Sequence, residues 1–323
     1  MGRLVFSIVI VVLGIGVGYM IQVVTKRKNF NLSIDNLKRK LQRSALLFFN
    51  PVAILGATWV ANIQDIKIAA LPFMGMAALF LGGGAAFLAS QIMKMGQKQT
   101  GSYIVCGGFT NIGSLGALFC FMFLGEAGFA LVPFYKLFEE LIYYAIGVPI
   151  AKSHSDNSTR NPSLVRRLKT SAADIFVVMA VLSIATGVVL NISGIPRPDV
   201  YALVNRVFIP FAAFLLLISI GLSMRFSSVK THLKPGLVIA MIKFALVPVV
   251  IMGIGYLFGL NQIDNGLPLK VVLILSSMPV GFIAMVPPTL YRLDIDLANA
   301  CWLITNAALV FEIPLLLFLF RFL

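Results

Sequence analysis

The sequence predicts an all-α polytopic membrane protein with ten transmembrane helices. Of its 323 residues, 59% are hydrophobic and only 12% are charged, whereas a soluble domain has about 25% charged residues. Apolar runs of about 20 residues, long enough to cross a bilayer, recur along the whole chain. We therefore expect a multi-pass protein of the cell membrane, with the lipid bilayer as its surroundings.

The ten predicted helices are separated by short connections. The first, residues 4–24, is too long for the core of a signal peptide. Nine further apolar runs follow it, at residues 41–60, 68–93, 102–124, 129–151, 173–192, 201–224, 235–260, 269–290 and 297–320. The polar stretch 153–170 is typical of a linker, so we expect a first five-helix half at 1–151, a linker at 152–172 and a second half at 173–323.

Lysine and arginine are concentrated in the odd-numbered connections. The first connection holds Lys26, Arg27, Lys28, Lys38, Arg39, Lys40 and Arg43, whereas the even-numbered connections together hold Lys67, Arg197 and Lys270. By the positive-inside rule the odd connections face the cytoplasm, and both termini lie outside. The net charge of +14 then reflects topology, and we expect no nucleic-acid partner.

Five helices in each half give the two halves opposite orientations, as in inverted repeats. Residues at matching positions are separated by 168 or 169 places: Leu4 and Ala173, Ile68 and Gly236, Gly113 and Gly281. The two halves are therefore predicted to be inverted five-helix repeats.

The fourth and ninth predicted helices are each interrupted near the midpoint. Gly113 and Asn111 tolerate backbone angles that other residues avoid, while Pro279 removes a backbone donor. Two crossing helix N-termini with free N–H groups would suit a carboxylate, although glycine and proline in membrane helices often only kink them or permit close packing. The predicted substrate-binding residues are Thr110, Asn111, Gly113, Ser114, Pro279, Val280, Gly281 and Asn306.

Ionisable residues inside the predicted helices are candidates for ion or proton coupling, because such residues are expensive in a membrane. They are Lys136, Glu139, Glu140, Lys243 and Glu312. The first three share one helix face at spacings of three and four, so they either take part in coupling or form a structural ion pair. Lys243 either attracts an anion or pairs with Glu139 or Glu140. No metal-ligand spacing is present, and we expect neither a metal nor a cofactor.

Several short motifs, spread along the chain in a consistent order, carry a family resemblance. They are Asn111-Ile112-Gly113-Ser114-Leu115-Gly116, Phe123-Leu124-Gly125-Glu126-Ala127-Gly128, Pro210-Phe211-Ala212, Lys243 followed by Pro248, and Met278-Pro279. In these the chain resembles the auxin efflux carrier family, in its bacterial type, within the bile acid/arsenite/riboflavin-like transporter superfamily. It departs from the family pattern at Ala117-Leu118, where a proline is common.

The resemblance implies transport of small organic anions, a scaffold of helices 1, 2, 6 and 7, and a moving core of helices 3–5 and 8–10. We therefore expect a secondary active transporter of a small organic anion, a carboxylate, with an elevator-type mechanism. Proton coupling is favoured over sodium coupling, and a homodimer is left open.

Two alternatives remain. The first is a sodium-coupled importer like the bile acid symporters, but their helix 9 motif Glu-Gly-x-Gln-Asn is replaced here by Met278-Pro279-Val280-Gly281-Phe282. The second is a channel or a sensor, although no helix shows a regular polar stripe and no connection is long enough for an output domain. The chain lacks nucleophile and metal motifs, so we do not expect an enzyme.

Overall fold

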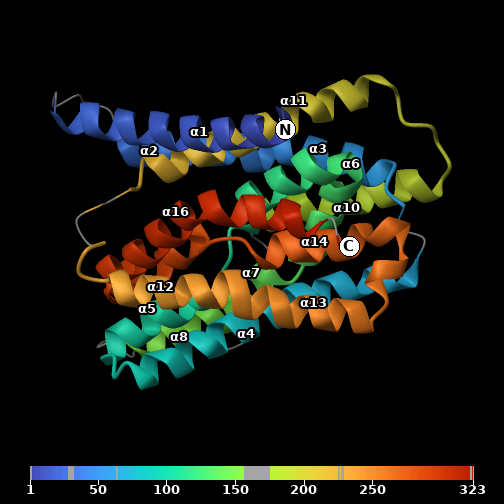
Figure 1. Ribbon diagram of the computed structural model, residues 1–323. Coiled ribbons are helices and arrows are strands. Elements are labelled where there is room, and N and C mark those ends of the chain that lie inside the picture. The colour runs from blue at the N-terminus through green and yellow to red at the C-terminus, as the bar shows by residue number, and fades with distance from the viewer. Residues whose placement is uncertain are drawn as a thin grey trace. The chain divides into compact units, whose positions relative to one another are not determined.

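The computed structural model describes residues 2–27, 33–62, 65–155, 175–224 and 226–322, apart from 227, 228 and 321. All the regular elements in these ranges are helices (Figure 1). Among the described residues, seven segments are long and apolar enough to cross a membrane: Val9–Arg27, Ile66–Ile92, Ile112–Ser153, Ile175–Ile192, Val200–Gly221, Leu233–Leu257 and Ile295–Leu319. The prediction of an all-α, multi-pass membrane protein is confirmed; the count of ten helices, the inverted repeat and the outer termini stay predictions.

The chain divides into two compact units, each built from three stretches of sequence. The first unit comprises Met1–Gln64, Gly113–Pro133 and Asp174–Met224, and the second comprises Asp65–Ile112, Phe134–Ala173 and Arg225–Leu323. The chain therefore passes from the second unit to the first directly after Ile112, within the fourth predicted helix.

Two closely packed helix pairs form much of the first unit. In the first pair, α1 (Gly2–Arg27) lies beside α11 (Val200–Gly221) (Figure 1). A Cβ atom on Gly18 would lie only 2.1 Å from the carbonyl oxygen of Ile218. In the second, α10 (Ile175–Ile192) packs on α3 (Asn50–Trp59). Small residues at such contacts let helix backbones approach closely, as is typical in membranes.

The basic segment before α3 is helical, although the sequence predicted a connection there. α2 (Ile34–Ser44) begins at Ser33, whose side chain accepts a hydrogen bond from the Asn36 N–H at 3.3 Å. Such an N-cap satisfies a donor that a helix leaves unpaired at its start. α2 contains no buried residue and runs through a π-helical turn, Ala45–Phe49, into α3. The helix thus starts well before residue 41.

The second unit is organised around two further helix pairs. A 3₁₀ turn, Ile66–Ala70, leads into α4 (Leu71–Ile92), which packs on α5 (Gln97–Gly108); a Cβ atom on Gly82 would lie 2.2 Å from the Gly107 carbonyl oxygen. α12 (Leu233–Met241) lies beside α16 (Ile295–Leu319) (Figure 1). The remaining helices are α7 (Glu139–Ile142), α8 (Val148–Ser153), α13 (Val247–Leu257), α14 (Leu267–Ser276) and α15 (Val286–Leu290).

The predicted helix 129–151 differs from the structure. α6 (Ala117–Lys136) runs across its start, and Gly125 interrupts α6 with a φ of 72°, which favours glycine. The chain then turns at Leu137 and Phe138 before α7 begins. A π-helical turn, Tyr143–Gly147, joins α7 to α8. Most of the predicted linker, residues 156–172, lies outside the described ranges.

Candidate functional site

Two interrupted helices of the second unit cross and pair through their backbones. α5 ends at Gly108, and helix resumes with the π turn Ile112–Gly116. α14 ends at Ser276, and helix resumes with the 3₁₀ turn Phe282–Met285. Between them Thr110 and Val280 form an antiparallel bridge. We call residues 109–111 and 279–281 the crossing.

Two backbone hydrogen bonds hold the crossing. The Asn111 N–H donates to the Pro279 carbonyl oxygen at 2.8 Å, and the Gly281 N–H donates to the Phe109 carbonyl oxygen at 3.0 Å. Pro279 has no N–H to donate, and at its position in the crossing only its carbonyl oxygen takes part in the pairing, as an acceptor. The pairing satisfies backbone groups that would otherwise be unpaired and buried.

Gly281 is needed at the crossing because there is no space for a side chain, and not because of an unusual backbone angle. Gly281 is extended, with φ −73° and ψ 150°, and a Cβ atom there would lie 2.8 Å from the Thr110 carbonyl oxygen. Gly113 lies inside the π turn, and neither it nor Asn111 has a positive φ. The backbone freedom that Gly113 and Asn111 allow is therefore not used here: the constraint is the close approach of two backbones.

The expectation of free N–H groups is also wrong at three positions. The N–H groups of Asn111 and Gly281 are used in the pairing. That of Val280 donates to Thr305 Oγ1 at 3.2 Å. Thr305, from α16, is fully buried. These three N–H groups therefore offer a ligand no positive charge, whereas a side chain at the crossing does.

Lys243 supplies that charge. It lies in the π-helical turn Ile242–Leu246, and only 1% of its surface is exposed. Its Nζ donates to Thr110 Oγ1 at 2.7 Å and to the Gly108 carbonyl oxygen at 3.3 Å. Within the described ranges no carboxylate oxygen lies within 4.0 Å of this nitrogen. Lys243 therefore forms no direct ion pair with Glu139 or Glu140, although the charge of Glu139 acts on it from a longer distance.

The two glutamates instead accompany Lys136. The Lys136 ammonium pairs with Glu140 and lies 3.5 Å from Glu139, whose side chain is 5% exposed. The turn at Leu137 and Phe138 interrupts the helix between them, yet the three charged groups still meet. The geometry fits a structural ion pair, and a coupling role for this cluster stays a prediction.

Three further polar groups lie on α16 or near it. Asn306 Nδ2 donates to the Trp302 carbonyl oxygen at 2.7 Å, and its Oδ1 is buried without a hydrogen-bond partner among the described residues. Glu312 is 6% exposed and lies near Ser277, at the end of α14. A buried acceptor without a donor is costly unless a ligand or water supplies one, so Asn306 remains a candidate for ligand binding.

The predicted residues Gly113 and Ser114 belong to the first unit. Ser114 is 6% exposed, in the helical turn that follows the crossing in sequence. The other six predicted binding residues are in the second unit: Thr110, Asn111, Pro279, Val280, Gly281 and Asn306.

The first unit also contains a polar contact that the sequence did not predict. Arg197 Nη1 donates to Glu126 Oε2 at 2.9 Å and to the Gly56 carbonyl oxygen at 2.8 Å. Glu126 follows the kink at Gly125. The contact ties this kink to α3 and to the segment before α11, so its geometry fits a structural role.

Comparison with known proteins supports the membrane assignment at a coarse level. No family model matches the chain. A protein of Methanocaldococcus jannaschii named as an uncharacterized transporter is 26% identical over 251 residues, which cover 76% of this chain and 77% of the relative. The chain is thus a helical, multi-pass membrane protein that is similar to a transporter.

Proposed function

We propose that the protein is a secondary active transporter that carries a small organic anion, a carboxylate, across the cell membrane. The observation that carries the proposal is the buried ammonium of Lys243 at the crossing, whose two hydrogen-bond acceptors are neutral oxygen atoms. A buried charge without a counter-charge is unfavourable. A carboxylate that approached Lys243 would provide a counter-charge in direct contact and form a charge-assisted hydrogen bond.

The predicted binding residues would then divide into two roles. Thr110, Asn111 and Asn306 offer side-chain polar groups to the ligand. Pro279, Val280 and Gly281 keep two backbones close enough for those groups to converge. Gly113 and Ser114 follow in sequence and form the first turn of the resumed helix. An irregular backbone within membrane-spanning segments is typical of transporter binding sites.

An elevator-type movement of the second unit remains part of the proposal. The presence of two compact units supports it, because each could move as a body. The first unit includes α1, α2, α3, α10 and α11, which correspond to the expected scaffold. It also includes 113–133, so we now propose that the second half of the fourth helix stays with the scaffold.

The proposal is tested by uptake of labelled mono- and dicarboxylates into proteoliposomes. Lys243→Met removes the ammonium, and we expect the apparent affinity to fall by about 10- to 150-fold, because hydrogen bonds to charged groups contribute about 1.5–3 kcal/mol. The matched control is Lys270→Met on α14, because Lys270 bonds only the nearby Asn265 carbonyl oxygen at 2.9 Å. Wild-type uptake by Lys243→Met would contradict the role of Lys243.

A second variant tests the crossing as a whole. Asn111→Ala combined with Pro279→Ala is expected to abolish uptake, and uptake at the wild-type level would exclude the crossing as the binding site. Uptake that does not saturate with substrate would favour a channel over a carrier.

The coupling mode is read from the same assay. Transport of one net charge gains about 2.3 kcal/mol per 100 mV of membrane potential. We expect uptake to respond to an imposed potential or to a pH gradient through Glu139, Glu140 or Glu312, and not to sodium. Uptake that requires sodium would favour the importer that resembles bile acid symporters.

A further inference from the structure

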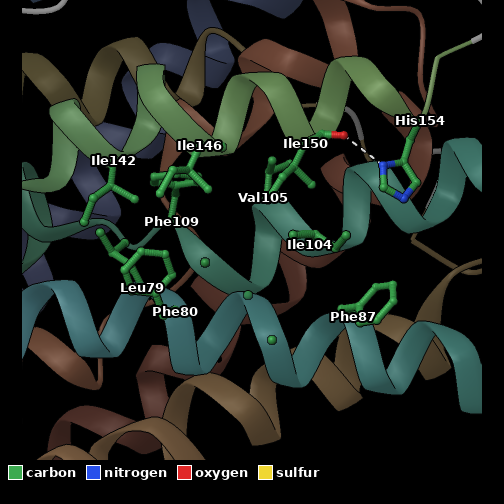
Figure 2. Close-up of a pocket in the computed structure, with 14 residues that line it drawn as sticks. Leu79, Phe80, Phe87, Ile104, Val105, Phe109, Ile142, Ile146, Ile150 and His154 are labelled. Atoms are coloured by element: carbon green, nitrogen blue, oxygen red, sulfur yellow. Dashed lines mark hydrogen bonds between the residues drawn. The ribbon is translucent and has the colours of Figure 1, made fainter. Parts of the chain in front are cut away.

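An apolar groove of about 380 Å³ runs through the second unit between α4, α5 and the segment formed by α7 and α8 (Figure 2). His154 provides the one polar side chain of its lining. Figure 2 shows His154 and Phe87 at one end of the groove and Leu79, Phe109 and Ile142 at the other. The groove therefore has a polar end and an apolar end.

Glycines of α4 create the open space. A Cβ atom on Gly84 would meet no atom within 4 Å, and one on Gly83 would come no closer than 3.7 Å to another atom. Both glycines line the groove. An apolar cavity offers water too few polar partners to hold it. Since α4 and α8 belong to segments that can cross a membrane, the hydrocarbon chains of the surrounding lipid are the molecules that fit this space.

The length of the groove matches one leaflet of a bilayer. From Ile142 to His154 a helix rises about 18 Å, at about 1.5 Å per residue. Half of the hydrocarbon core of a bilayer measures about 15 Å. A single acyl chain that enters beside His154 would thus end near the middle of the membrane, against Phe109 and Gly108.

Two lysines lie close to the polar end of the groove, outside its lining. Lys152 lies two residues before His154, so only its long side chain can bring its ammonium toward this end. A Cβ atom on Gly101 of α5 would lie 2.7 Å from the His154 Cβ. This contact brings the first turn of α5, with Lys98, to the same end. His154 Nδ1 lies 2.8 Å from the Ile150 carbonyl oxygen, which leaves Nε2 for a ligand. The nearby carboxylate of Asp294 is engaged by the Gln99 amide and by the Leu297 N–H.

We propose that the groove binds one acyl chain of an anionic phospholipid, whose phosphate lies against His154, Lys152 and Lys98. Basic pockets between membrane helices are suited to anionic head groups, and the apolar lining suits the chain. The site is separate from the proposed carboxylate site, but it reaches Gly108, whose carbonyl oxygen accepts a hydrogen bond from Lys243. Bound lipid is therefore expected to stabilise the second unit up to the crossing.

The proposal is tested with purified protein in a mild detergent, titrated with phosphatidylglycerol, phosphatidylcholine or inorganic phosphate. The midpoint of thermal unfolding is measured. We expect phosphatidylglycerol to raise the midpoint by about 5 °C at saturation, phosphatidylcholine to raise it less, and phosphate alone to leave it unchanged.

Gly84→Leu fills the groove and is expected to remove the effect of phosphatidylglycerol. The matched control is Gly253→Leu on α13, which is also an exposed helical glycine with no atom within 4 Å of an added Cβ. Gly84→Val serves as the second groove variant if Gly84→Leu fails to fold. A full lipid effect in a folded Gly84 variant would overturn the proposal.

The head-group contact is tested separately. His154→Gln combined with Lys152→Gln is expected to make the effect of phosphatidylglycerol equal to that of phosphatidylcholine. Equal effects of the two lipids on the wild-type protein would exclude an anionic head-group site. If Gly84→Leu converts a dimer to a monomer and leaves the lipid effect intact, the groove is a contact between copies and the proposal is wrong.

Discussion

The crossing depends on the absence of a side chain at Gly281, which makes Gly281→Ala a direct test of its geometry. The added Cβ would lie 2.8 Å from the Thr110 carbonyl oxygen, 2.9 Å from the Thr110 carbonyl carbon and 3.3 Å from the Asn111 nitrogen. All three are backbone atoms, so no side-chain rotation relieves the contact. Residues 109–111 and 279–281 then have to move apart. The hydrogen bonds from Asn111 to Pro279 and from Gly281 to Phe109 have to lengthen or break.

The size of the effect follows from those two bonds. A hydrogen bond contributes about 0.5–1.5 kcal/mol, and overpacking a close-fitted site costs about 1–3 kcal/mol. We therefore expect Gly281→Ala to destabilise the crossing by about 2–3 kcal/mol, which corresponds to a loss of about 30- to 150-fold in apparent substrate affinity if the crossing binds the substrate.

The measurement is substrate uptake into proteoliposomes together with thermal unfolding of the same protein. Gly253→Ala is the matched control, because a Cβ atom there meets nothing within 4 Å, and it should behave as wild type. If Gly281→Ala keeps both the wild-type affinity and the wild-type unfolding midpoint, the close approach of the two backbones is not needed and our account of the crossing fails.

Two other contacts give further predictions. Thr305→Val leaves the buried Val280 N–H without its acceptor and should lower the free energy of unfolding by about 1–3 kcal/mol. Thr305→Ser keeps the hydroxyl and should retain most of that stability. Equal losses of stability in both variants would refute the role of this bond. Lys136→Met leaves Glu139 buried without its cation and should destabilise the protein by a similar amount. Adding Glu139→Gln should recover part of the loss, and a purely additive double variant, measured by thermal unfolding, would show that the pair does not interact.

The sequence predicted the positions of the interruptions better than their conformations. Pro279 and the glycines around it mark a place where a helix cannot continue, and this information is local. Pairing across the crossing is not local. Lys243 contacts Gly108 and Thr110, which are 135 and 133 positions away in the sequence, and the hydrophobic periodicity of the chain does not predict such contacts. For the same reason the sequence left the partner of Lys243 open between an anion and a glutamate.

The errors in the helix boundaries have local causes. α2 lies outside the predicted helices because its residues are polar and its start is set by capping at Ser33, whereas apolar runs indicate only segments that can cross a membrane. The turn at Leu137 and Phe138 was missed because both residues are apolar and lie in an apolar run. Hydropathy identifies segments that can cross a membrane, but it does not show where their backbone hydrogen bonds stop.

The contact between Lys243 and the Gly108 carbonyl oxygen has a consequence for release of a ligand. The ammonium serves as a cation at the C-terminal end of α5, where a helix carries partial negative charge. A carboxylate that recruits the same ammonium has to compete with this end of the helix. If the proposed carboxylate binds here, its affinity would be lower than a lysine without other partners would provide, and the ammonium would return to the helix end when the anion leaves. A carrier needs such reversibility, because a ligand that is held too tightly on one side of the membrane is not delivered to the other.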